Sequence, residues 1–282
     1  MKAFSPLHNF ATREKYFEFS DYFSLKVAHD LNYQYGDSDH FISKMESDDV
    51  CRCYNWLIID LDKKNIDIED EIILNTLLIA FWIFSSNKVS FKYIFNDYEQ
   101  GCFINFSRFE FNEKDINKSD YTFDELTKIK EYFNLLVSVS QANGRIHTAI
   151  SNTFQGCVAF NWKTAFLLYS AAVEALLTYK RGSGITRRLS KTYACLVETD
   201  FSKRKQEYTN FSYLYKIRSD IMHGSINNSN PDDNLTNLSK FAVMLRKLWQ
   251  TILSDSNIIN IIEKQDSDRE IFFNKIETGF NP

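Results

Sequence analysis

The stretch YLYKIRSDIMHG, residues 213–224, decides the fold that we expect for the C-terminal part of the chain. Leu214, Ile217 and Ile221 recur at helical spacing, which predicts a helix that turns this apolar stripe toward a core. Gly224 favours the left-handed conformation in which helices often end. Arg218 then lies beside the stripe, whereas His223 lies about 180° from Leu214, on a face that meets water or another surface.

A histidine in the last turn of a helix is well placed for proton transfer. The helix dipole favours a protonated imidazole there, and imidazole exchanges protons near neutral pH. Asp220, three residues earlier, is placed to orient or charge this ring. The plainer alternative is that His223 only completes the end of the helix.

Helical texture continues on both sides of this stretch. Apolar residues at every third or fourth position predict helices at 122–155, 161–180, 185–198, 203–224 and 234–254, with a polar helical tail near 258–277. Thr122 and Glu125 have the spacing of a capping box. RGSG (181–184) and NNSNPDDN (227–234) separate neighbouring helices.

The N-terminal part has a different texture. Short β-like runs at 15–20, 54–60, 88–95 and 102–109 alternate with polar connections, and one helix is expected at 70–85. The polar patch NEKDINKSD (112–120) marks the change. We therefore predict a mainly α protein, in which a smaller mixed α+β domain (1–118) precedes a helical bundle (119–282).

Composition sets limits on the class of protein. The 282 residues are 44% hydrophobic, which allows a large core, and only 8 Gly and 3 Pro disfavour a turn-rich all-β fold. The five cysteines show no disulfide framework, and MKAFSPLHNFATREK at the N-terminus does not read as a secretory signal. The longest apolar run, 72–84, is too short to span a bilayer. We expect a cytoplasmic protein with no membrane partner.

Charge is unevenly distributed along the chain. Residues 151–225 hold eleven Lys or Arg and five Asp or Glu, a local charge of +6 in a chain of formal net charge −4. A basic segment in an acidic protein suggests a surface that meets an anion such as a nucleic-acid backbone. Ordinary solvated helix faces are the alternative.

The motif carries a resemblance to a known family. RSDIMH (218–223) resembles the R-x4-6-H motif of HEPN domains, and its flanks resemble those of the ApeA-like branch. YSAAVEALLTYK (169–180) is similar to an earlier helix of that branch, with Glu174 as its characteristic acid, and ITRRLSKTYACLV (185–197) to the helix after it. The resemblance covers about 120–255. Ser219 departs from the family, since many members carry Asn, Asp or His there.

The resemblance implies a bundle of four or five helices that commonly forms a homodimer, with two motif helices facing each other across a cleft. Many members are metal-independent endoribonucleases that act as toxins or antiviral abortive-infection effectors. We therefore expect RNA, possibly tRNA, as substrate, with no cofactor and no metal, and an N-terminal domain that senses a trigger or selects the RNA. The alternative is a non-catalytic HEPN module that binds nucleotide, RNA or a protein partner.

Each candidate site residue has an expected role. RNA carries its own nucleophile, the 2′-hydroxyl, so cleavage to a 2′,3′-cyclic phosphate and a 5′-hydroxyl needs proton transfer and charge stabilisation. His223, with His223 of a second copy, would move the protons, and Arg218 would grip the non-bridging oxygens. The remaining candidates are Glu174, Asp220, Ser219, Lys216, Arg187 and Arg188. Glu174 holds Arg218 or another basic residue in position, or else forms a structural ion pair, and the role of Ser219 is open. Lys216, Arg187 and Arg188 either contact the RNA backbone or are solvated charges.

The other histidines and the glycine-rich loop have weaker claims. His147 has Arg145 nearby, but their spacing matches no mechanism. His8, His29 and His40 show no ligand-like clustering in the sequence. GSG (182–184) lacks the spacing and the Lys-Ser/Thr of a phosphate-binding loop, so we interpret it as a hinge.

Overall fold

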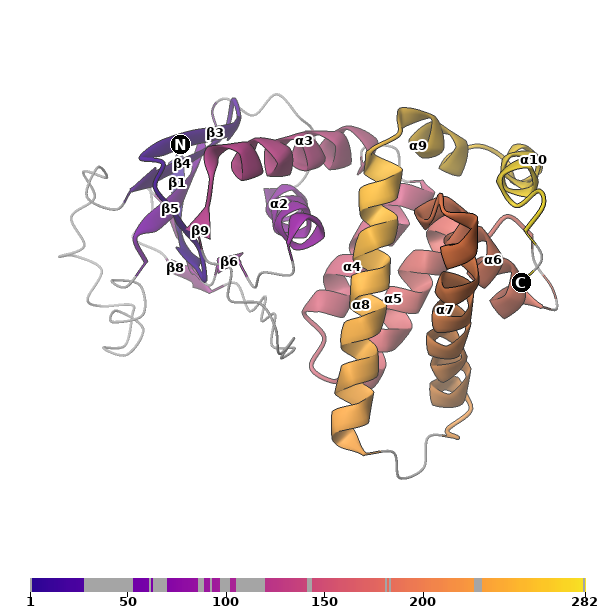
Figure 1. The fold of residues 1–282 in the computed structure, drawn as a ribbon. Helices are drawn as coiled ribbons and strands as arrows, with labels where there is room; N and C mark the ends of the chain where they lie inside the picture. Colours follow the sequence, from indigo (N-terminus) through magenta and orange to yellow (C-terminus); the bar gives the residue numbers. More distant parts are fainter. Residues whose placement is uncertain are drawn as a thin grey trace. The chain divides into compact units, whose positions relative to one another are not determined.

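The computed structural model describes residues 2–27, 53–60, 62, 70–85, 89–91, 93–96, 102–104, 120–140, 144–180, 182, 184–225, 230–280 and 282. The chain divides into two compact units (Figure 1). Unit 1 comprises Met1–Phe109 and Lys114–Val137, and unit 2 comprises Glu110–Glu113 and Ser138–Pro282. The fold is mainly α with a small α+β part near the N-terminus, which confirms the predicted fold class.

Unit 1 is built around an antiparallel sheet. Its strands run in the order β3-β4-β5-β1-β7-β8, and β6 pairs with β1 beside β7. The strands are β1 (Lys2–His8), β3 (Tyr16–Ser20), β4 (Phe23–Val27), β5 (Asn55–Asp60), β6 (Ser90–Phe91), β7 (Tyr93–Asn96) and β8 (Cys102–Ile104). A separate short ladder joins β2 (Ala11–Thr12) in parallel with β9 (Asp120–Tyr121).

The alternation of apolar residues explains this sheet. In β4 the side chains of Phe23, Leu25 and Val27 are buried and the two between them are half-buried, as expected for a strand with one covered face. The predicted runs at 15–20 and 54–60 are confirmed as β3 and β5, and the run at 88–95 holds β6 and β7. Residues 105–109 of the fourth predicted run lie outside the described residues. Strands β1 and β4 were not predicted.

In the described part of unit 1 there are two helices. Helix α2 (Asp70–Phe84) is buried along most of its length, as its unbroken apolar sequence indicates. Helix α3 (Phe123–Ser140) buries Leu126, Ile129 and Phe133, and the Phe133 ring packs 5.7 Å from that of Phe23 in β4. The division between the units thus falls near the end of a helix that we had assigned to the second domain at 119–282.

Unit 2 is a helical bundle. Figure 1 shows α4, α5, α7 and α8 lying lengthwise beside one another, and α5 contacts each of the other three. The helices of the unit are α4 (Arg145–Cys157), α5 (Trp162–Leu177), α6 (Ile185–Val197), α7 (Phe201–Met222), α8 (Pro231–Leu253), α9 (Ser256–Ile262) and α10 (Asp266–Ile276). The predictions at 161–180, 185–198, 203–224 and 234–254 are confirmed as α5 to α8.

Two predicted helices are each divided in the structure. The segment 122–155 forms α3 and α4, and the tail near 258–277 forms α9 and α10. The predicted capping box is confirmed, because the Glu125 carboxylate accepts from the Thr122 N–H at 3.0 Å and the Thr122 hydroxyl accepts from the Glu125 N–H at 3.4 Å. Helix α4 begins after Gly144, which has no side chain that could cap a helix. The local sequence therefore gave no signal for the start of α4.

The start of α4 is capped by a residue from far along the chain. The Glu263 carboxylate, just after α9, accepts from the N–H groups of Arg145 at 3.0 Å and Ile146 at 2.7 Å. A Cβ on Gly144 would lie 1.9 Å from Glu263 Oε2, so the carboxylate occupies the space that a side chain would fill. The division between α3 and α4 therefore depends on a contact across 118 residues.

Candidate active site

Helix α7 carries the motif at its C-terminal end, and the helix becomes less buried toward that end. Asp200 caps its start by accepting from the Ser202 N–H at 2.9 Å. Phe211, Leu214 and Tyr215 are the buried residues of this helix, and none of its later residues is buried. The predicted core stripe is therefore right for Leu214 and wrong for Ile217 and Ile221, which are only half-buried. The last two turns of α7 are accessible to solvent.

Arg218 pairs with Glu174, whose apolar setting predicted a partner, with Arg218 as one candidate. Glu174 lies near the C-terminal end of α5, and its Oε1 is 3.3 Å from Arg218 Nη2. The side chains of Arg218 and Glu174 remain 35% and 26% exposed. An arginine offers five N–H donors and one nitrogen faces Glu174, so the partly exposed guanidinium keeps donors that Glu174 does not use.

Tyr215 completes a three-residue cluster that sequence reasoning missed. Its hydroxyl donates to the same Glu174 Oε1 at 2.6 Å. Burial raises the pKa of Tyr215, and the hydrogen bond to Glu174 and its negative charge raise it further. The carboxylate oxygen is therefore shared between a buried phenol and the motif arginine. A tyrosine rather than a phenylalanine at a core position, three residues before Arg218, was the only available signal.

Main-chain hydrogen bonds place His223. The helix ends at Met222, and His223 is the C-cap. The Gly224 N–H donates to the Ile221 carbonyl at 3.2 Å, and the Ser225 N–H donates to the Asp220 carbonyl at 2.8 Å. This pattern is a Schellman motif, and it requires the left-handed φ of +67° that Gly224 adopts. The predicted helix stop at Gly224 is confirmed, and the imidazole is exposed.

The two motif side chains do not converge within one chain. Arg218 and His223 are separated by about 140° around α7. Arg218 faces α5 through Glu174, whereas the His223 side chain faces solvent. One chain therefore presents a partly exposed guanidinium and an exposed imidazole in different directions, and the two groups cannot meet on one phosphate without a second copy.

Ser219 and Asp220 make no side-chain contact with His223. Both are half-buried, and no hydrogen bond or ion pair joins either side chain to another described residue. Asp220 contributes its carbonyl to the Schellman motif instead. The roles predicted for these two side chains remain predictions.

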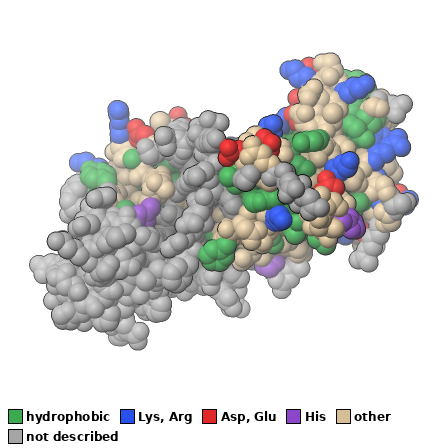
Figure 2. Space-filling view, turned by 90° about the horizontal axis from the view of Figure 1, so that it is seen from below, with side chains coloured by type: hydrophobic (Ala, Val, Ile, Leu, Met, Phe, Trp, Pro, Cys, Tyr) green, Lys and Arg blue, Asp and Glu red, His purple; other side chains and the backbone are tan. Residues whose placement is uncertain are grey.

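The predicted RNA-binding cations have different surroundings. Lys216 and Arg187 are exposed, whereas Arg188 donates from Nη2 to the carbonyls of Lys180 and Gly182, both at 3.2 Å. Arg188 therefore holds the loop before α6. On the face drawn in Figure 2, Lys and Arg side chains are dispersed, with hydrophobic side chains exposed between them.

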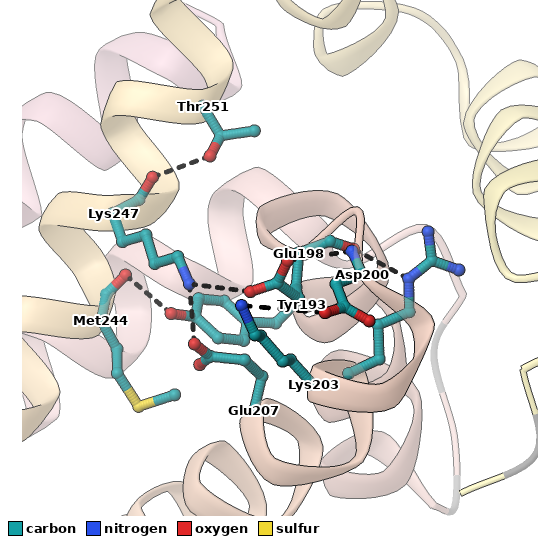
Figure 3. A network of polar contacts seen from close by, with 9 residues as sticks. Tyr193, Glu198, Asp200, Lys203, Glu207, Met244, Lys247 and Thr251 are labelled. Carbon is teal, nitrogen blue, oxygen red and sulfur yellow. Dashed lines mark hydrogen bonds and ion pairs between the residues drawn. The ribbon is translucent and has the colours of Figure 1, made fainter.

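A network where α6, α7 and α8 meet is structural. Lys247 of α8 lies 2.7 Å from Glu207 and 4.0 Å from Glu198, and the Tyr193 hydroxyl donates to the Met244 carbonyl at 3.3 Å (Figure 3). Burial raises the pKa of Tyr193, so it stays protonated. These contacts fix α7 against α8 and neutralise Glu207.

Metal-binding clusters are absent from the described part of the chain, where no group of three or more His, Cys, Asp or Glu side chains could hold an ion. His8 pairs with Cys53 through Nδ1 at 3.5 Å, and His147 lies half-buried on α4. His29 and His40 lie outside the described residues. Within the same limits, every helix is too short or too polar to cross a bilayer.

Comparisons with known proteins add no family or relative. No protein-family model, curated protein or solved structure matches the chain.

Proposed function

We propose that the chain is an endoribonuclease of the HEPN type. The observation that supports this most strongly is the arrangement at the end of α7, where Arg218 contacts Glu174 and stays partly exposed, and His223 is exposed at the helix end. Cleavage of RNA by its own 2′-hydroxyl requires charge stabilisation and proton transfer, and a guanidinium and an exposed imidazole are suited to these two roles.

The proposed reaction follows from these groups. One imidazole accepts the proton of the 2′-hydroxyl while its oxygen attacks phosphorus, and Arg218 stabilises the charge on the non-bridging oxygens. A second imidazole donates a proton to the 5′-oxygen as the phosphorus–O5′ bond breaks. The products are a 2′,3′-cyclic phosphate and a 5′-hydroxyl, and no atom is oxidised or reduced.

We further propose that the active form is a homodimer. The divergence of Arg218 and His223 supports this, and so do the apolar side chains beside them. Met222 is 59% exposed, and Ile217 and Ile221 are half-buried, although each would be expected in a core. Action in the cytoplasm as a toxin or abortive-infection effector, with a sensing role for unit 1, remains a proposal from the resemblance.

A non-catalytic binding module is the second candidate. The same divergence favours it, because a lone copy presents Arg218 and His223 on different faces. In that case, replacing Arg218 would weaken the binding of an anion, and RNA would stay intact with either protein.

Purified wild-type protein, His223→Ala and Arg218→Ala should be incubated with tRNA and total RNA in EDTA, and the ends of the products mapped. We expect 2′,3′-cyclic phosphate ends from the wild type and a loss of about 100-fold or more in rate for each variant. His147→Ala is the matched control, since it removes an imidazole elsewhere in unit 2 and should cut normally. Intact RNA with all four proteins would favour the binding module.

A further inference from the structure

The outward face of α7 has one chemical character over five turns. At 100° per residue, five exposed side chains from residue 205 onward fall within a sector of about 80° that ends at the motif histidine. We call them the α7 stripe: Lys205, Thr209, Tyr213, Lys216 and His223. Two are cations, one is a hydroxyl, one is an aromatic ring and one is an imidazole.

Acidic charge is nearly excluded from this face. Helix α7 has two acids, and Glu207 lies about 120° from Tyr213, where Lys247 neutralises it at 2.7 Å. Asp220 falls within the sector but is half-buried. The stripe therefore presents Lys205 and Lys216 with little opposing charge, and it is complementary to a polyanion.

Tyr213 is the aromatic residue of α7 that packing does not explain. Phe201 and Tyr208 pack on Phe280, and Phe211 stacks with Tyr215 at 5.9 Å. Tyr213 is 61% exposed and has no ring, hydrogen-bond or ion-pair contact with another described residue. Tyr213 thus presents an exposed ring on α7 between Lys205 and Lys216. Single-strand RNA sites typically combine basic residues with such a ring, on which a base stacks.

We propose that the α7 stripe binds an unpaired segment of RNA, with one base stacked on Tyr213 and the backbone contacting Lys216 on its way to His223. Ten residues of helix separate Tyr213 from His223, or about 15 Å, which is the rise of about four stacked nucleotides. This inference rests on the proposed function and adds a substrate class, namely a single strand or loop. A paired base in a duplex has no free face to offer Tyr213.

Binding of a fluorescent, 2′-O-methylated RNA of twelve nucleotides tests the stripe without any cleavage. Tyr213→Ser should weaken binding by about 5- to 100-fold, whereas Tyr213→Phe, which keeps the stacking face, should bind within about twofold of wild type. Lys216→Gln should weaken binding and lower the slope of log affinity against log salt by about 0.7. A duplex of the same length should bind more weakly than the single strand.

The matched controls remove the same chemistry elsewhere in unit 2. Phe160→Ser deletes a ring that is 93% exposed before α5, and Lys240→Gln deletes an exposed charge on α8, and both should bind like the wild type. Equal binding by wild type and Tyr213→Ser would overturn the proposal. So would a monomer formed by Tyr213→Ser in light scattering from a dimeric wild type, since the stripe would then be a subunit interface.

Failure of the stripe and failure of the nuclease give different results. If the 2′-O-methylated RNA binds through Tyr213 and natural RNA is never cut, the proposed RNA site on the α7 stripe is supported and the proposed nuclease activity is contradicted. If natural RNA is cut and Tyr213→Ser binds normally, the nuclease activity is supported and the RNA site on the stripe is contradicted. Absence of any RNA binding overturns both.

Discussion

At the scale of single residues, the shared oxygen of Glu174 is the most informative feature. A glutamate free to rotate forms a two-point pair with an arginine and occupies its fork. The Tyr215 hydroxyl holds Oε1 at 2.6 Å, and the contact to Arg218 is a single one at 3.3 Å. We therefore expect Tyr215 to act as a positioning residue that limits how closely Glu174 approaches the guanidinium.

Tyr215→Phe should lower the free energy of unfolding by about 1 to 2 kcal/mol, since it deletes a partly buried hydrogen bond to a carboxylate. It should also lower the rate of RNA cleavage. In a Glu174→Gln background the same change should cost less on both measures, because the group through which it acts is already altered. Urea titrations and cleavage assays on the four proteins of this cycle give both readouts.

Tyr208→Phe is the control on the same helix, since its ring packs on Phe280 and its hydroxyl forms no hydrogen bond with a described residue. The cycle also has a pH signature. The pKa of Tyr215 is raised in the folded protein. Its contribution to the free energy of unfolding is therefore complete below the ordinary tyrosine pKa of about 10 and declines as pH rises beyond that value. Strictly additive effects of the two substitutions would contradict the positioning role.

At the scale of elements, helix ends in unit 2 depend on other helices. Glu263, after α9, caps α4, and Arg269 of α10 donates to the Leu176 carbonyl at the end of α5 at 3.2 Å. Arg269 is fully buried, and burial lowers its pKa to about 10, so it keeps its charge at neutral pH. The segment after α8 thus supplies caps that α4 and α5 lack locally.

Gly144→Ala should destabilise the protein by about 1 to 2 kcal/mol, the usual cost of losing an N-cap. The φ of Gly144 is −94°, which alanine tolerates, so the cost arises from displacing Glu263. Glu263→Ala should cost a similar amount, and the double variant little more than either single one, as judged by urea or thermal unfolding. A full second loss in the double variant would show that the two positions act separately.

The limits of prediction at this scale have physical causes. Periodicity located α5, α6, α7 and α8 within a few residues, because amphipathic spacing and turn residues are local signals. It joined α3 to α4, since Gly144 is capped by a carboxylate 118 residues away. It also placed Ile217 and Ile221 in the core, because spacing alone does not tell where a helix leaves the core. The apolar flanks of Glu174 predicted a basic partner, with Arg218 as one candidate. Tyr215 was not predicted to join them, because its spacing is that of an ordinary core residue.

At the scale of the whole molecule, the proposed site is complete only between copies. Co-expression of wild-type protein with an excess of His223→Ala, so that the subunits exchange, should lower RNA cleavage below that of the wild-type protein alone. A mixed dimer holds one imidazole, whereas the proposed reaction uses two. Wild-type protein should scatter light as a dimer, heavier than the 33.2 kDa chain.

This inhibition needs a control for exchange itself. Affinity capture of tagged His223→Ala should retain untagged wild-type protein, and an excess of His147→Ala should leave cleavage unchanged. Captured mixed dimers of wild type and His223→Ala that cut RNA at the full wild-type rate would contradict the shared site. Monomeric protein at micromolar concentration that still cuts RNA would contradict it more directly.

The Schellman turn at Gly224 has a consequence for how such a protein can change over generations. The location of residue 223 is dictated by peptide groups of its neighbours, so the imidazole contributes almost nothing to holding the chain together. If the chain is the nuclease proposed above, one substitution at His223 would abolish its activity and leave its stability nearly unchanged. Loss of activity with retention of the folded protein would then need a single step in evolution.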